Sequence, residues 1–92
     1  MAIVKLRLPA VLVELCGGEP SVELSAGTAA QALEALFNQR PELRVHLLDE
    51  SQRLRPHVMF LVNGENSRWW ETLDRALAEG DELVIMQAVS GG

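Results

Sequence analysis

The residues best suited to chemistry are the two glycines at the carboxyl terminus, Gly91 and Gly92. They follow an apolar run at residues 83–86 that is typical of a buried strand. Because glycine has no Cβ and adopts positive φ freely, such an end can enter a narrow channel and present the terminal carboxylate to another protein's active site. Chain ends are also commonly disordered and tolerate small residues, so a frayed terminus explains the pair equally well.

The other reactive side chains form no catalytic or metal-binding pattern. Cys16 stands beside two glycines with no nearby cation to lower the pKa of its thiol, which favours a small apolar residue and leaves its role open. His46 and His57 lack the spacing of metal ligands, so we expect no metal site. Nor are Ser, His and Asp arranged as a nucleophilic triad. We expect a chain that does not catalyse a reaction alone.

The composition indicates one small globular domain spanning residues 1–92. Of its 92 residues 48% are hydrophobic but only 4% are aromatic, so aliphatic side chains must form the core. The net charge of −5 disfavours a nucleic-acid partner, which requires clustered Lys and Arg. No apolar run approaches the roughly 18 residues of a membrane span. We therefore expect a cytoplasmic protein with no nucleic-acid and no membrane partner.

Hydrophobic periodicity predicts two strands and a helix in the first half of the chain. Residues 3–8 and 22–24 alternate between apolar and polar side chains, as half-buried strands do, and we expect them to pair as a hairpin with a long loop. A short helical turn at 11–15 lies in that loop. Thr28 and Gln31 then have the spacing of a capping box, and apolar residues follow at helical intervals until Pro41 ends the helix.

The second half is predicted to complete a mixed sheet. Residues 42–55 indicate a connector with a short helical turn, 57–62 a strand, and Asn63 and Gly64 a tight turn. An irregular or short helical segment at 68–78 leads into a last strand at 82–87. The order predicts an α+β fold of the β-grasp, or ubiquitin-like, type, in which one main helix covers a mixed sheet of four to five strands.

The C-terminal third carries distinctive motifs at residues 62–66 (VNGEN), 73–77 (LDRAL), 79–85 (EGDELVI) and 88–92 (AVSGG). Through these motifs the chain resembles the MoaD/ThiS family of sulfur carriers, and the upstream order of elements agrees with that family over the whole domain. Gln87 departs from the pattern, because many relatives have proline before the tail. A residue with a backbone N–H leaves the last strand one further hydrogen-bond donor.

The resemblance implies a carrier whose reactive residue is Gly92, at the end of a tail of about residues 88–92 that includes Val89, Ser90 and Gly91. The Gly92 carboxylate would be adenylated by an activating enzyme that uses ATP and magnesium. A sulfur donor of the rhodanese or cysteine desulfurase type would convert it to a thiocarboxylate, and an acceptor synthase would take the sulfur. The carrier would hold no permanent cofactor.

Two groups of residues near the tail in sequence are candidates for a partner interface. Trp69 and Trp70 are adjacent, so we expect one indole to be buried and the other exposed. Asp81 and Glu82 belong to an acidic group that is either a solvated surface or a complement to a basic docking face. The other members of this group are Glu71, Asp74 and Glu79.

Two further functions stay open beside the sulfur carrier. In one, a ubiquitin-like modifier is conjugated through Gly92 to lysines; in the other, a β-grasp interaction module has an inert tail. Within the family, the long connector at 42–55 favours a MoaD-like or CysO-like member over the compact thiamine carriers. The sulfur would then serve cysteine or specialised-metabolite synthesis, or molybdopterin, where such a carrier can be the small non-catalytic subunit of molybdopterin synthase.

Overall fold

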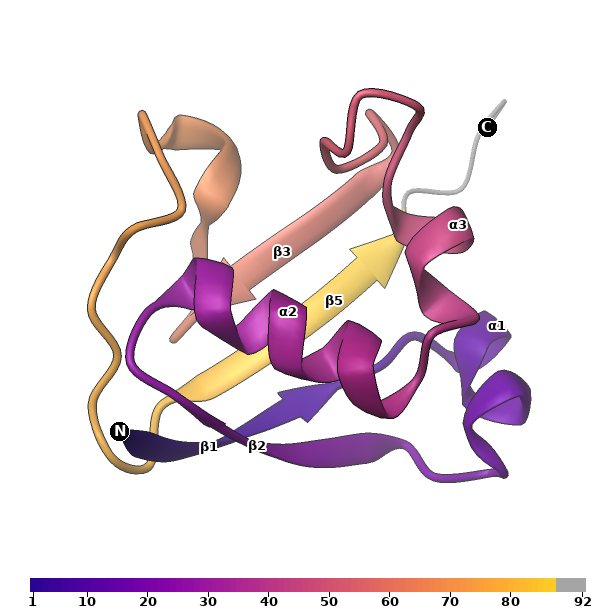
Figure 1. The fold of residues 1–92 in the computed structure, drawn as a ribbon, viewed down its shortest axis with the longest axis horizontal. Coiled ribbons are helices and arrows are strands. Elements are labelled where there is room, and N and C mark those ends of the chain that lie inside the picture. Colours follow the sequence, from indigo (N-terminus) through magenta and orange to yellow (C-terminus); the bar gives the residue numbers. More distant parts are fainter. Residues whose placement is uncertain (88–92) are drawn as a thin grey trace.

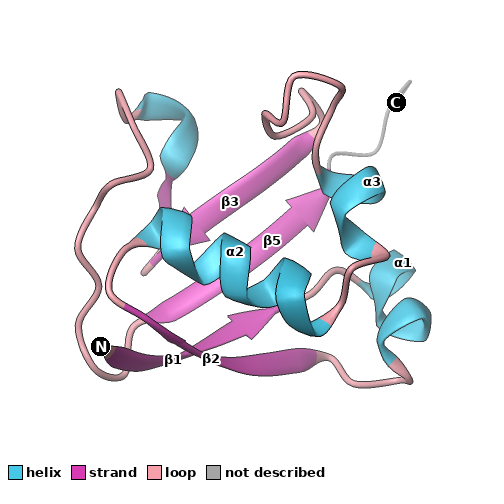
Figure 2. Ribbon diagram, in the orientation of Figure 1, coloured by secondary structure: helices cyan, strands magenta, loops and turns pink. Residues whose placement is uncertain are grey.

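A computed structural model describes residues 1–87, apart from the side chain of Cys16. Five strands form one sheet in the order β2-β1-β5-β3-β4, and the helices pack mainly on one side of it (Figures 1 and 2). The strands are β1 (Ala2–Arg7), β2 (Ser21–Ala26), β3 (Val58–Val62), β4 (Glu65–Asn66) and β5 (Glu82–Gln87). The helices are α1 (Ala10–Val13), α2 (Ala29–Gln39) and α3 (Leu43–Leu47), with single 3₁₀ turns η1 (Glu14–Cys16) and η2 (Ser67–Trp69).

The sheet is mixed, as the sequence predicts, and β5 lies at its centre. β1 and β2 form the predicted hairpin, in antiparallel register from Ala2 opposite Ala26 to Arg7 opposite Ser21. β5 runs parallel to β1 on one side and antiparallel to β3 on the other. The parallel neighbours β1 and β5 are connected by all of the elements between them in the chain, because parallel strands need a crossover connection.

Helix α2 covers the sheet and begins where the sequence predicts. The Thr28 hydroxyl accepts a hydrogen bond from the Gln31 N–H at 3.2 Å. The Gln31 side chain reaches back one residue further than an ordinary capping box, accepting from the Gly27 N–H at 2.8 Å. The apolar face of α2 is buried; it comprises Ala29, Ala32, Leu33, Leu36 and Phe37.

The loop before β5 completes the N-terminus of α2. The first N–H groups of a helix have no partner within the helix. Here the Ala29 N–H donates to the Arg75 carbonyl at 2.9 Å, and the Ala30 N–H donates to the Leu73 carbonyl at 2.8 Å. Because the carbonyls of Arg75 and Leu73 accept hydrogen bonds from α2, the segment 73–77 is held in place without forming a strand of the sheet.

The core lies between α2 and the inner face of the sheet. Phe60, Leu6, Leu83 and Leu36 are fully buried, and alternate strand residues point into this layer. The connector contributes to the core as well, because Leu43 and Leu47 of α3 are fully buried. The connector's short helical turn is therefore confirmed as part of the core.

Candidate functional site

The predicted reactive end lies just beyond the described part of the chain. Gly92, Gly91, Ser90 and Val89 all belong to residues 88–92, which are outside the described residues. The last described residue is Gln87, which ends β5 opposite Val58 of β3. With glutamine in place of proline, β5 remains in register with its neighbour through its final residue.

The solvent-facing side of β3 and β5 carries an apolar surface that leads to this point. Met59 lies directly opposite Met86, and Leu61 directly opposite Val84, in the antiparallel ladder. Met86 is 45% exposed and the other three are half-buried. We call these four residues the sheet-face patch. Exposed apolar groups gathered on one face, rather than scattered, are typical of an interaction surface.

Sequence reasoning did not identify the sheet-face patch, although a signal for it was present. Residues 58–62 and 83–86 are continuous apolar runs without polar alternation. Such runs are typical of strands that are covered on both faces. In the isolated chain α2 covers only one face, so the second set of apolar side chains is left for another molecule.

A basic edge borders the sheet-face patch on its β1 side. Arg7 lies in register with Val84, and Lys5 lies in register with Glu82. Lys5, Arg7 and Glu82 are exposed, and the buried neighbours Leu6 and Leu83 point the opposite way, so these charges share the patch's face of the sheet. The structure thus places Glu82 on the face that carries the patch.

Asp81 has a structural task in the loop. Its carboxylate accepts a hydrogen bond from the Ala78 N–H at 2.8 Å and another from the Asn63 side chain at 3.1 Å. These two bonds, first that of Ala78 and then that of Asn63, lower the pKa of Asp81 below its ordinary value of 3.8. Asn63 in turn bonds the Glu82 N–H at 3.0 Å, so the predicted tight turn after β3 fastens the start of β5.

The two tryptophan side chains differ in exposure to solvent, as predicted. Trp69 is 79% exposed. Trp70 is half-buried rather than fully buried: its indole N–H donates to Glu65 at 2.9 Å, and Arg75 stacks over its ring at 4.4 Å. Arg75 also pairs with Glu65 at 2.8 Å. The role of the pair in a partner interface stays a prediction.

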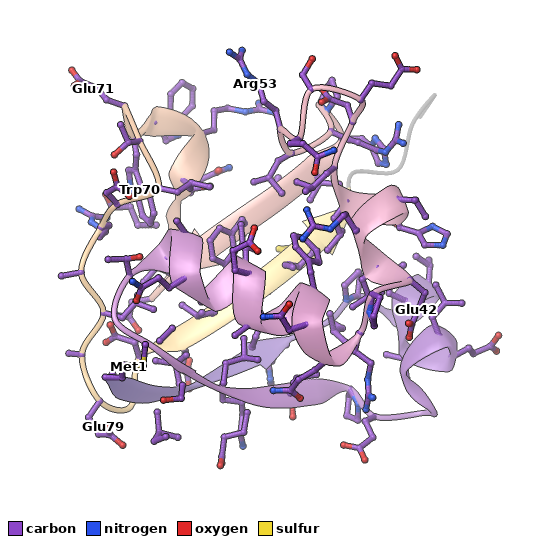
Figure 3. The ribbon with its side chains drawn as sticks, in the orientation of Figure 1. Met1, Glu42, Arg53, Trp70, Glu71 and Glu79 are labelled. Carbon is purple, nitrogen blue, oxygen red and sulfur yellow. The ribbon has the colours of Figure 1, made fainter. Side chains whose placement is uncertain are left out.

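Three of the acidic residues that are close to the tail in sequence lie at the start of β5, opposite to Gln87: Glu79, Asp81 and Glu82. Glu79 accepts a hydrogen bond from the Ile3 N–H at 2.9 Å, beside the start of β1, and Figure 3 shows Glu79 and Glu71 on the side of the molecule away from Gln87. A six-residue strand spans about 17 Å. A docking role for this group therefore concerns a surface separate from the root of the tail.

The remaining candidates are dispersed. His46 lies in α3 and His57 precedes β3, and residues 1–87 contain no cluster of three or more His, Cys, Asp or Glu side chains able to hold a metal. The backbone of Cys16 belongs to η1, while its side chain is outside the description. Among the described helices, none is long and apolar enough to cross a membrane.

The fold and this sheet surface define a small ubiquitin-like protein of the β-grasp class, with its central strand leading to the chain end. More narrowly, the chain belongs to the ThiS family, whose family model matches residues 6–92.

Relatives of the chain match it over nearly its full length. The sulfur carrier protein CysO of Mycobacterium tuberculosis (strain ATCC 25618 / H37Rv) is 32% identical over 97% of this chain and 98% of its own. The crystal structure of the Amycolatopsis orientalis BexX/CysO complex contains a chain that superposes with a TM-score of 0.84 at 29% identity, covering 97% of this chain and 99% of that one. Small archaeal modifier protein 1 of Methanosarcina acetivorans gives 0.85 at 33% identity, covering 100% and 98%.

Proposed function

We propose that this chain is a sulfur carrier, a co-substrate rather than an enzyme, whose Gly92 carboxylate is activated and loaded with sulfur by partner enzymes. The observation that carries the proposal is the match of the ThiS family model to residues 6–92. The sheet-face patch adds a surface for partner enzymes, because its four apolar side chains lie on β3 and on β5, the strand that ends at Gln87. The match to sulfur carrier proteins over almost the whole chain supports it.

The chemistry of a carboxylate dictates the order of the steps. A terminal carboxyl group has a pKa near ~3.5 and is ionised at neutral pH, so it is a poor electrophile for a sulfur nucleophile. An activating enzyme that holds ATP and magnesium would couple it to AMP, which supplies a leaving group. The outer sulfur of a persulfide on a sulfur donor of the rhodanese or cysteine desulfurase type would then displace AMP and form an acyl disulfide with the Gly92 carbonyl. A second thiol would reduce this acyl disulfide, forming a disulfide with the donor cysteine and releasing the thiocarboxylate on Gly92.

The sheet-face patch supplies affinity for the partner enzymes that the short tail alone does not provide. Apolar area removed from water contributes roughly 25 cal/mol per Å², and Met86 and its neighbours are available for such burial. Arg7 and Lys5 at the edge favour an acidic rim on the partner, since complementary charges at a rim raise the association rate. We place the protein in the cytoplasm, where ATP and its partner enzymes are available.

The proposal is tested by mass spectrometry of the intact chain. Incubation with ATP, magnesium, the cognate activating enzyme and a sulfur donor should replace one oxygen atom of the chain by sulfur, at Gly92. A chain lacking Gly92 should remain unmodified under the same conditions. An unchanged mass of the full chain, with an activating enzyme shown to load another carrier, would sink the proposal.

A second function is favoured by the similarity to small archaeal modifier protein 1. Activation by adenylation would begin in the same way, but Gly92 would then form an amide with a lysine of another protein. Conjugates of higher mass that disappear when Gly92 is deleted would support this function, and they are compatible with sulfur transfer by the same chain.

For the destination of the sulfur we propose the synthesis of cysteine or a specialised metabolite ahead of molybdopterin. The support is the similarity to CysO proteins at about a third of positions. The protein that copurifies with the thiocarboxylate form identifies the acceptor: a pyridoxal-phosphate-dependent cysteine synthase supports this destination, and a molybdopterin synthase large subunit or a thiazole synthase contradicts it.

A further inference from the structure

The helix side of the molecule carries a second surface feature, a groove of about 820 Å³. It lies between α2, the connector residues 48–58 and the segment 66–73. In Figure 3 the labelled Arg53 marks the connector rim, and Trp70 and Glu71 mark the opposite rim. We call it the helix-side groove. It lies on the opposite side of the sheet from the sheet-face patch.

The floor of the helix-side groove is apolar. Leu33 and Phe37 of α2 and Leu48 of the connector are buried beneath it. Leu54 and Leu73 are only partly buried and pack against the core from the two walls. An apolar group of a ligand can therefore pack against Leu54 and Leu73 and remove further apolar area from water.

The rim of the helix-side groove is basic, although the protein as a whole is acidic. Arg53, Arg55 and Arg68 line it, and within residues 1–87 none of the three has a carboxylate within 4.0 Å. Of the two acidic residues in the lining, Glu34 is already paired with Arg44 at 3.6 Å, which leaves Glu71.

Two of the three arginines are held in place by the backbone. Arg55 donates from Nε and Nη2 to the Val45 carbonyl, at 3.1 and 3.0 Å. Arg68 donates from Nη2 to the Pro56 carbonyl at 3.2 Å. A carbonyl does not neutralise a guanidinium, and each guanidinium has five N–H donors, so both groups retain positive charge and free donors for a carboxylate.

We propose that the helix-side groove binds an acidic peptide segment of a partner protein, with an apolar side chain of that segment on the floor and its carboxylates on the arginine rim. The three arginines of the rim match a short acidic segment, whereas nucleic acid needs a longer surface of clustered Lys and Arg, which this groove lining lacks. The proposal is independent of the sulfur-carrier function, because the groove and the sheet-face patch use different faces of the sheet. One partner can therefore hold the protein by the groove while another works at the sheet face.

The test is an NMR titration of the full-length, isotope-labelled chain with the capped peptide Ac-EDEIFDED-NH2. Amide shifts should change at residues 48–58, at 66–73 and along α2, and not on the solvent face of β1. Replacing the acidic residues of the peptide by their amides, or its central Ile-Phe by Ser-Ser, should each weaken binding by about tenfold, since both the charges and the anchor contribute.

Two charge-reversed proteins separate the groove from general electrostatics. Arg53→Glu with Arg68→Glu should weaken peptide binding by about tenfold. Lys5→Glu with Arg7→Glu makes the same change of net charge on the opposite face and should leave binding within about twofold. Equal loss in both proteins, or shifts centred on β1, would overturn the proposal.

The alternative occupant is the chain's own end. A protein ending at Gln87 keeps every described element and should bind the peptide as the full chain does. Binding that is stronger by about tenfold without residues 88–92 would mean that the groove serves this chain's own carboxyl end, and would overturn the assignment to a partner.

Discussion

At the scale of single residues, the group formed by Glu65, Trp70 and Arg75 explains how the irregular segment before β5 is fixed. One carboxylate accepts from an indole and a guanidinium, while the guanidinium covers the indole face. The hydrogen bond from Arg75, and after it that from Trp70, lowers the pKa of Glu65 below its ordinary value of 4.5. The charged form of Glu65 is thus the one that favours folding.

This lowered pKa predicts a pH-dependent loss of stability. Because the folded pKa lies below the unfolded one, the contribution of Glu65 is fully present above about pH 4.5 and is lost as the pH falls through the folded pKa. Glu65→Gln should therefore lower the urea midpoint at neutral pH, and lower it by less at an acidic pH well below 4.5.

Glu71→Gln is the control for this measurement, since the Glu71 side chain makes no ion pair and no hydrogen bond within residues 1–87. It should leave the urea midpoint nearly unchanged at both pH values. A Glu65→Gln protein as stable as the native chain at neutral pH would show that the group contributes nothing to folding.

At the scale of elements, α2 depends on contacts from outside the helix. Its N-terminus is completed partly by Thr28 and partly by carbonyls of the segment 73–77. That segment is remote in sequence, so helix and loop become ordered together. Arg75 of the same loop pairs with Glu65 of β4 and stacks on Trp70, which connects the loop to the β3–β4 hairpin.

The cap predicts a measurable helix contribution. Thr28→Ala removes the hydroxyl that accepts from the Gln31 N–H and should cost about 1 kcal/mol in the free energy of unfolding. Thr28→Ser keeps the acceptor and should recover most of the loss. If both substitutions cost the same in urea unfolding, the hydroxyl bond is not what stabilises the start of α2.

The elements with clear periodicity and their β-grasp arrangement were predictable from the sequence, and the surfaces that these elements form together were not. Alternation identified β1 and β2, and helical spacing with a capping pair identified α2, because both patterns are local. The acidic residues before β5 are neighbours of the tail in sequence yet lie at the other end of the strand. The helix-side groove combines residues from separate segments, so no local pattern predicts it. The sheet-face patch did have a local signal, the continuous apolar runs at 58–62 and 83–86.

At the scale of the whole molecule, the sheet separates two surfaces with different chemistry. One face is an apolar patch with a basic edge near the end of β5, and the other is a groove with an arginine rim above an apolar floor. One partner protein can therefore bind the groove while a second partner binds the sheet face, and both contacts can exist at the same time.

The sheet-face patch predicts that docking can be lost without loss of the fold. Met86→Glu places a charge in a surface that a partner must desolvate, and should slow thiocarboxylate formation by about tenfold or more. Val11→Glu, at another exposed apolar residue, is the matched control and should react at the normal rate. Normal loading of the Met86→Glu protein would exclude the patch as the docking surface while leaving the sulfur-carrier function intact.

The central position of β5 also has a mechanical consequence. Tension applied at Gln87 along the strand acts across the ladder, which comprises three register pairs with β1 and five with β3. The hydrogen bonds of the antiparallel β3–β5 ladder run nearly perpendicular to the strand, and those of the parallel β1–β5 ladder are slanted. A pull along β5 therefore loads both ladders in shear instead of peeling the bonds one after another. A carrier built this way can be drawn into a partner's active site and withdrawn from it repeatedly, with the force borne by the middle of its sheet.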